Sequence, residues 1–185
     1  MTDPVTTPMT TPATDQATDQ AGLATWAALV AADSGLAAAA RALLERSGTG
    51  EGLLATVRGD APPRIHPVNV AIVDGRLVTV VLAGSAKAVD LLADGRYALH
   101  AHQDPTVPHE VLLRGRVVWV TDAAERARLV EGWAFEVPAD AHVLDLRIEH
   151  ALLGERADPG AWPPAYRSVR PIAAGGQVAV AAAPV

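Results

Sequence analysis

Three short apolar runs follow one another closely in the middle of the chain, and they constrain its fold more than any other feature. They cover residues 53–58, 64–73 and 76–82. Asp74-Gly75 separates the second run from the third, and Asp-Gly between apolar runs is typical of a β-hairpin turn. Parallel neighbours need a crossover of about a dozen residues, and these connections are too short to supply one. The runs are therefore predicted to be antiparallel strands.

Further predicted elements extend this arrangement to a small barrel. Strands are expected at residues 97–102, 111–120 and 142–148, and a helix at 85–94. Another helix begins at Asp122, which has capping-box spacing from Glu125. Five or six antiparallel strands with two or three interposed helices favour a barrel over a doubly wound parallel sheet. The fold class is predicted to be mainly β with helices.

The barrel domain is assigned to residues 49–172, and the two ends of the chain are predicted to be tails. Residues 1–21 consist largely of Thr, Pro, Asp and Gln and contain an ATDQ repeat. Such a segment buries too little apolar surface to offset the entropy of ordering, so we expect a disordered tail. The small-residue stretch 173–185 is expected to be a flexible tail.

Residues 22–48 are predicted to form a helical preface to the barrel. This Ala- and Leu-rich segment is broken near residues 33–35, where Ser34 is expected to cap a second helix. The apolar residues of that second helix have helical spacing and form one stripe: Leu36, Ala40, Leu43 and Leu44.

Charge and composition exclude several classes of partner. The net charge of −6 argues against a nucleic-acid binder. No uncharged apolar run reaches about 18 residues, so no membrane span is expected. The absence of cysteine and of a secretory signal favours a cytoplasmic protein. Because aromatic residues make up only 4% of the chain, the core must consist mostly of Ala, Val and Leu.

The stretch GSAKAVDLLADGR at residues 84–96 is predicted to be a helix whose first turn holds an anion. Ser85 is the expected N-cap, and Lys87 lies in the first turn. Val89 and Leu92 are expected to face inward. A helix N-terminus offers unpaired N–H groups and partial positive charge, to which this stretch adds a hydroxyl and an ammonium. The combination predicts a phosphate site; the alternative is an ordinary cap beside a solvated lysine.

Two pairs of polar residues share strand faces. Period-two alternation places Thr56 and Arg58 on one face of the first strand, and Arg64 and His66 on one face of the second. Arg58 is therefore a candidate for anion binding. The alternative is that the opposite, apolar face is buried and Arg58 points to water.

Three histidines lie close together in the sequence without completing a metal motif. His100 and His102 share a strand face, and such a pair can hold one ion. His109 opens the sequence HEVLL, in which Leu113 stands where an HExxH motif needs its second histidine. No metal site is predicted, and the histidines are interpreted as pocket walls, polar groups at an interface or exposed side chains.

Six short motifs succeed one another along the predicted barrel. They are GLLATVR at 52–58, PRIHP at 63–67, DGRL at 74–77, SAK at 85–87, RYAL at 96–99 and GRV at 115–117. Their order and spacing resemble the pyridoxamine 5′-phosphate oxidase-like FMN/F420-binding split β-barrel family, above all its small actinobacterial-type members. The resemblance covers residues 50–148.

This resemblance implies an antiparallel, Greek-key-like split β-barrel that forms a homodimer, with FMN or the deazaflavin F420 at the interface. The family's phosphate contacts correspond here to Arg58, Ser85 and Lys87. Thr56 and His66 are weaker matches near the same pocket. Residues 78–82 would lie along the isoalloxazine edge. Haem is the alternative ligand after these coenzymes. The basic C-terminal segment of the vitamin B6 oxidase has no match here, so B6 oxidation is not expected.

The function inferred from the sequence is an oxidoreductase that uses FMN or F420 and acts on a small, unidentified substrate. In such enzymes the protein chiefly orients the coenzyme, so no catalytic acid or base need be visible. None is assigned, although His66 and His100 are candidates for proton handling. Motifs of other enzyme classes, GxSxG, Walker A and GxGxxG, do not occur. Two alternatives stay open: a non-catalytic carrier of flavin, F420 or haem, and a dimeric barrel without a ligand.

Overall fold

The computed structural model describes residues 23–101, 109–131, 133 and 135–173 of the chain. The predicted tails, apart from residue 173, lie outside these residues, and so does His102.

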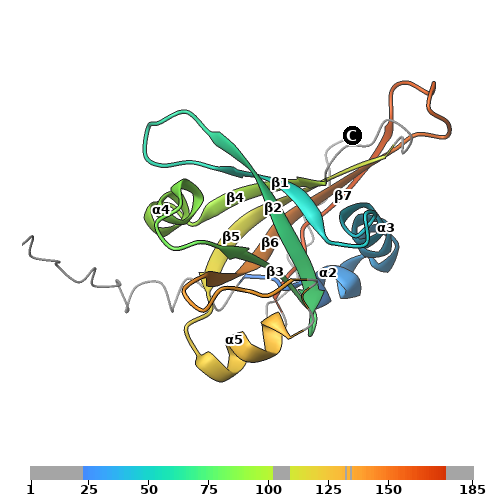
Figure 1. The fold of residues 1–185 in the computed structure, drawn as a ribbon. Helices are drawn as coiled ribbons and strands as arrows, with labels where there is room; N and C mark the ends of the chain where they lie inside the picture. The colour runs from blue at the N-terminus through green and yellow to red at the C-terminus, as the bar shows by residue number, and fades with distance from the viewer. Residues whose placement is uncertain (1–22, 102–108, 132, 134, 174–185) are drawn as a thin grey trace, which may run out of the picture.

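One antiparallel sheet, in the strand order β3-β2-β1-β4-β5-β6-β7, makes up most of the described structure (Figure 1). Its strands are β1 (Glu51–Thr56), β2 (Arg64–Val73), β3 (Arg76–Val81), β4 (Arg96–Ala101), β5 (Glu110–Trp119), β6 (His142–Glu155) and β7 (Ala165–Val169). Strand β3 also pairs with β6, which closes β1 to β6 into a barrel. The order β3-β2-β1-β4 is that of a Greek key, so the predicted fold class is confirmed.

The hairpin between β2 and β3 forms at the predicted turn. Asp74 and Gly75 both have positive φ, 49° and 71°, as the tight turns of two-residue hairpins require. Gly75 also lies against α2, where an added Cβ would come within 3.0 Å of the Ala27 Cβ. The turn therefore reverses the chain and also packs against α2.

Strand β6 is twice as long as the sequence predicts, and β7 is not predicted at all. One edge of β6 pairs with β3 over residues 142–145 and with β7 over residues 151–155, while β5 occupies its other edge. The segment containing Trp162, Pro163 and Pro164 connects β6 to β7, a short strand that pairs with the end of β6.

Helices α2 (Trp26–Ala32) and α3 (Ser34–Leu44) cover one side of the barrel (Figure 1). Their apolar side chains, the predicted stripe of α3 included, belong to the same buried cluster as the barrel interior. The predicted cap was wrong by one residue. Asp33 caps α3, because its carboxylate accepts the N–H of Leu36 at 2.8 Å, and Ser34 is the first helical residue.

Helices α4 (Ala86–Ala93) and α5 (Ala123–Val130) begin at the predicted caps, Ser85 and Asp122. The predicted inward face of α4 was wrong. Val89 is exposed, and the buried residues are Ala88, Asp90 and Leu91. The helix is therefore rotated so that a carboxylate, and not only apolar side chains, faces β1.

Most of the core consists of Leu, Val and Ala, as the composition requires, and Trp26 and Tyr97 are the buried aromatic residues of the described structure. No helix within the described residues is long and apolar enough to cross a membrane.

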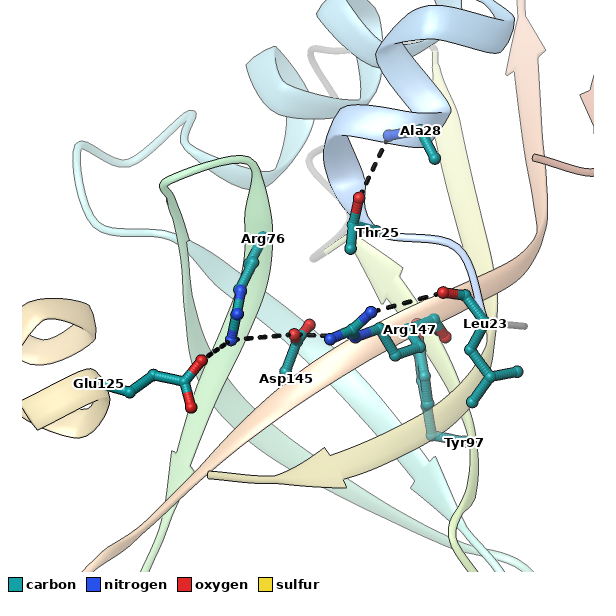
Figure 2. A network of polar contacts seen from close by, with 8 residues as sticks. All are labelled: Leu23, Thr25, Ala28, Arg76, Tyr97, Glu125, Asp145 and Arg147. Atoms are coloured by element: carbon teal, nitrogen blue, oxygen red, sulfur yellow. Dashed lines mark hydrogen bonds and ion pairs between the residues drawn. The ribbon is translucent and has the colours of Figure 1, made fainter. Parts of the chain in front are cut away.

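A polar network fastens the closing strand pair β3–β6 (Figure 2). Asp145 of β6 is fully buried and accepts a hydrogen bond from Arg147 Nε at 2.8 Å. Arg76 of β3 lies 3.6 Å from the same carboxylate and also contacts Glu125 of α5. Burial raises the pKa of Asp145, against the opposing effect of the two arginines. The Tyr97 hydroxyl donates to the Arg147 carbonyl at 3.1 Å, which ties β4 to the network.

Candidate functional site

A buried carboxylate, Asp90 of α4, brings two of the predicted site residues together. The Thr56 hydroxyl donates to Asp90 Oδ2 at 3.0 Å, and His66 Nε2 lies 3.2 Å from the Thr56 oxygen. Since the single hydroxyl hydrogen points to Asp90, His66 Nε2 is the donor of the second bond. Strand β1 buries Thr56 together with Leu54 and leaves its other face half-buried. The polar face of the first strand is thus the inward one.

Two arginines meet the same carboxylate from the ends of neighbouring strands. Arg58 Nε lies 3.6 Å from Asp90 Oδ1, and Arg64 Nη1 lies 3.5 Å from Oδ2. Arg64 is the register partner of Thr56, whereas Arg58 lies past the end of β1 and not on the predicted strand. Both side chains remain partly exposed, so each guanidinium can contact Asp90 and a ligand at the same time.

Lys87 lies close enough to this cluster to lower the pKa of His66. Burial lowers the pKa of His66, and the Lys87 and Arg64 charges lower it further, while Asp90 raises it. Ser85 caps the same helix, because its hydroxyl accepts the N–H of Ala88 at 3.4 Å. The five predicted residues therefore lie in or beside α4 and its cap, and four of them are linked through Asp90 or His66.

Lys87 also lines an open groove of about 340 Å³ between β2, β3 and the segment after α5. Residues 80–82 form one wall, Pro67 and Asn69 of β2 contribute another, and Phe135 and Pro138 cover the side towards α5. The wall includes the end of the strand 78–82 that was expected to follow the ring of a coenzyme. Apart from Lys87 and Glu136 the lining is uncharged, so the groove suits a planar apolar group with an anionic end.

A second groove of about 380 Å³ adjoins the first and shares Asn69 and Phe135 with it. Trp133 and Phe135 stand edge to face in its wall, with ring centroids 5.4 Å apart. The sequence offered no signal for this groove, because its sides come from the segment after α3, from β2 and from the segment after α5, which are distant in the chain.

His100 and His109 have different partners, and His102 lies outside the described residues. His100 Nε2 lies 3.6 Å from Glu110 Oε2, and the Tyr166 hydroxyl donates to Glu110 Oε1 at 2.8 Å. His109 instead accepts the backbone N–H of Arg156 at 3.3 Å. Among the described residues, no three His, Cys, Asp or Glu side chains are placed to hold a metal ion.

Asp90 and Arg64 are the site residues that sequence reasoning missed. The signal for Asp90 was a lone acid between Val89 and Leu91 in a short apolar helix, three residues after Lys87. Arg64 was placed on the face of His66 but was not joined to the anion site. Only the pairing of β1 with β2 puts it next to Thr56.

The sequence matches the family model described as pyridoxamine 5′-phosphate oxidase over residues 36–153, well over half of the chain. Among curated proteins, none matches this sequence.

Several solved structures share the fold. A haem binding protein from Mycobacterium smegmatis is 23% identical with a TM-score of 0.54, over 72% of this chain and 57% of that one. ChuZ from Campylobacter jejuni is 9% identical with a TM-score of 0.56, over 65% and 56%. A NimC/NimA family protein from Clostridium acetobutylicum is 18% identical with a TM-score of 0.53, over 70% and 92%. This chain thus spans little more than half the length of the first two proteins, and the likeness concerns the fold.

Proposed function

Because the chain belongs to the pyridoxamine 5′-phosphate oxidase family, we propose that it binds a phosphate-bearing flavin coenzyme, FMN or the deazaflavin F420, and acts as an oxidoreductase on a small substrate. The observation that carries the proposal is the apolar groove between β2 and β3 with Lys87 at its lining, next to the Asp90 cluster. When bound, such a coenzyme supplies hydride transfer. The chain's own residues bind it, orient it and exclude water from its ring.

The charges of the cluster fit a phosphate group. Arg58, Arg64 and Lys87 are three cations, and Asp90 is the carboxylate that contacts the two arginines. Positive charge is left over at the N-terminus of α4, where unpaired N–H groups also favour an anion. We assign the phosphate to Lys87, Arg58 and this helix end, with Ser85 fixing the helix start and Thr56 and His66 holding Asp90 in place.

A second copy of the chain is the proposed partner, with the coenzyme at the interface. The exposed apolar side chains of Leu82 and Phe135 line the groove, and those of Ile65 and Val89 are exposed two residues along the chain from its lining residues Pro67 and Lys87. On the outer barrel surface the half-buried Leu53, His100 and Leu112 are cross-strand neighbours and continue this face over β1, β4 and β5. A homodimer would cover this face and enclose the coenzyme.

A carrier that binds flavin, F420 or haem without turnover is the second candidate. Lys87 and Glu136 are the titratable residues that line the groove within the described structure, so little in it is suited to proton transfer. The haem binding protein from Mycobacterium smegmatis shares the fold, which makes haem a ligand to include in the test. Reduction of the loaded protein by NAD(P)H, or oxidation of reduced F420 by a substrate, separates an enzyme from a carrier.

Lys87 gives this proposal a direct test, because it is the only lysine of the sequence. The purified protein is titrated with FMN, F420, riboflavin and haem, followed by absorbance and fluorescence. Lys87→Ala should weaken FMN at least about tenfold, the loss expected for one charge-assisted contact, and leave riboflavin unchanged because it has no phosphate. Arg128→Ala, which removes an exposed cation from α5, is the matched control and should change neither.

Carbon-13 reductive methylation adds a spectroscopic probe of the same contact. It labels Lys87 and the N-terminal amine alone, and FMN should shift the Lys87 signal more than riboflavin does. Equal losses of FMN and riboflavin affinity in Lys87→Ala would refute the assigned phosphate contact. A protein that takes up none of the four ligands would refute the coenzyme proposal itself.

A further inference from the structure

A third groove, on the outer surface of β4, β5 and β6, is strongly cationic and shares no lining residue with the two described above. It encloses about 340 Å³. Its polar lining consists of three arginines, one histidine, one glutamate and a tyrosine: Arg96, Arg114, Arg170, His150, Glu149 and Tyr97. This positive charge gathers in a chain whose net charge is −6. Such an excess of one sign in a concave surface attracts ligands of the opposite charge.

Two of these charged side chains are already compensated. Arg96 donates to Asp94, with Nε at 2.9 and 3.1 Å from the two carboxylate oxygens. Glu149 lies 3.5 Å from Arg116. The charge that is left over therefore belongs to the other members of the groove.

Arg114 and Arg170 lie near His150, and the contact with Arg114 leaves the Nε2–H of His150 as a hydrogen-bond donor. Arg114 Nη2 lies 3.3 Å from His150 Nδ1, and since a guanidinium can only donate, the proton of the neutral imidazole is on Nε2. Burial, then Arg114 and Arg170, lower the pKa of His150, so the ring is neutral near pH 7. In the described part of the chain neither arginine has a carboxylate within ion-pair distance. The groove presents two guanidinium groups and one N–H, all of them donors.

The backbone beneath these side chains is irregular in a way that sets their positions. The register between β5 and β6 shifts at Arg114 and Gly115, and Glu149 is left as the extra residue of a bulge. Bulges re-aim the side chains beside them. Gly115 is required here, because an added Cβ would lie 1.9 Å from the Arg147 carbonyl oxygen. The groove is therefore built on a specific local distortion and not on a regular strand surface.

We propose that Arg114, His150 and Arg170 form a second oxyanion site, which takes the phosphate group of inorganic phosphate or of a phosphomonoester. Guanidinium groups bind phosphate through paired N–H donors, and a phosphate offers more acceptor positions than a carboxylate for three donor groups. The site is separate from the coenzyme groove, so it does not depend on the function proposed above.

The test follows the imidazole NMR signals of His150, identified with His150→Gln, in the full-length chain at constant ionic strength. The probes are inorganic phosphate, methyl phosphate and acetate. Saturable shifts with both phosphate probes support a site open to phosphate esters, and saturation by inorganic phosphate alone supports a site for the free ion. No saturation, or acetate acting equally well, would overturn the site.

Matched variants locate the response. Arg114→Gln and Arg170→Gln should each weaken phosphate binding about tenfold, whereas Arg128→Gln and Lys87→Ala should leave the His150 response unchanged. All four positions are at least partly exposed, and circular dichroism checks that the variants are folded. If Lys87→Ala abolishes the response, the phosphate lies in the coenzyme groove and the second site is refuted. If Arg114→Gln changes only the dissociation of a dimer, the arginines are a protein contact and the site is refuted as well.

Discussion

Asp90 and Asp145 are two buried aspartates in nearly the same chemical setting, yet they serve different parts of the molecule. Each is at most 1% exposed, each has two arginines within 3.6 Å, and in each Oδ1 lacks a hydrogen-bond partner among the described residues. The difference lies in the arginines. Arg147 and Arg76 beside Asp145 are 19% and 28% exposed, whereas Arg64 and Arg58 beside Asp90 are 39% and 45% exposed.

The exposure of the arginines decides what each carboxylate does. Around Asp145 both arginines have a second partner within the protein, since Arg147 also donates to the Leu23 carbonyl and Arg76 also contacts Glu125 (Figure 2). Arg147 lies 2.8 Å from Asp145, whereas neither arginine lies closer than 3.5 Å to Asp90, and the side chains of Arg58 and Arg64 are the more exposed ones. An arginine with two partners in the protein stabilises the fold, and an arginine with one partner and an exposed side chain is available to a ligand.

The largest effect expected from this comparison is the loss of stability in Asp145→Asn. The substitution leaves two partly buried guanidinium groups without their carboxylate, and the free energy of unfolding should fall by about 3 kcal/mol. Urea denaturation measures it. Asp94→Asn, which breaks the exposed pair with Arg96, is the control and should cost less than about 1 kcal/mol. Equal losses in the two variants would mean that burial of Asp145 does not matter.

Asp90→Asn should cost less stability, about 1 kcal/mol, because its arginines can be hydrated and the amide oxygen still accepts from Thr56. The same change should strengthen FMN binding, since a negative charge is removed from beneath Arg58 and Arg64. Denaturation and FMN titration of one preparation test both parts. Weaker FMN binding would show that Asp90 holds the arginines in place and does more than offset their charge.

Replacing one arginine from each cluster should separate an effect on stability from an effect on FMN binding. Arg76→Gln should lower the free energy of unfolding by about 1 kcal/mol and leave FMN affinity unchanged. Arg58→Gln should leave stability within about 0.5 kcal/mol, as for most surface substitutions, and weaken FMN about tenfold. If both variants changed stability and FMN affinity to a similar extent, the Asp145 and Asp90 clusters would not have different roles.

The smallest effect concerns pH. Because burial and Lys87 hold the pKa of His66 below 6.5, the unfolded chain binds a proton in a window below pH 6.5 in which the folded chain does not. Stability is therefore full above this window and is lost as the pH falls through it. His66→Gln should reduce the loss between about pH 7.5 and pH 5.5 in urea denaturation. His150→Gln should reduce the loss in the same way, because the pKa of His150 is lowered too.

An unchanged acid response in His66→Gln would show that the titration of His66 does not contribute to the pH dependence of stability.

Much of the site could be read from the sequence, because its signals are local. Ser85 as the cap and Lys87 in the first turn follow from the order of residues at one helix start, and Thr56 follows from strand alternation. Asp90 could not be found in this way. Its position depends on how α4 is rotated against β1, which a helix with small and apolar residues on more than one face does not specify.

The sequence by itself determined the antiparallel course of the first strands, the starts of α4 and α5, the Leu-, Val- and Ala-rich core and the single lysine. Each of these depends on neighbouring residues or on composition. The tertiary structure alone decided that Thr56, Arg58, Arg64, His66 and Lys87 gather around Asp90, and that β6 is long enough to pair with both β3 and β7. Those outcomes depend on strand register and on the packing of a helix against the barrel, because residues distant in the chain must meet before their charges can interact.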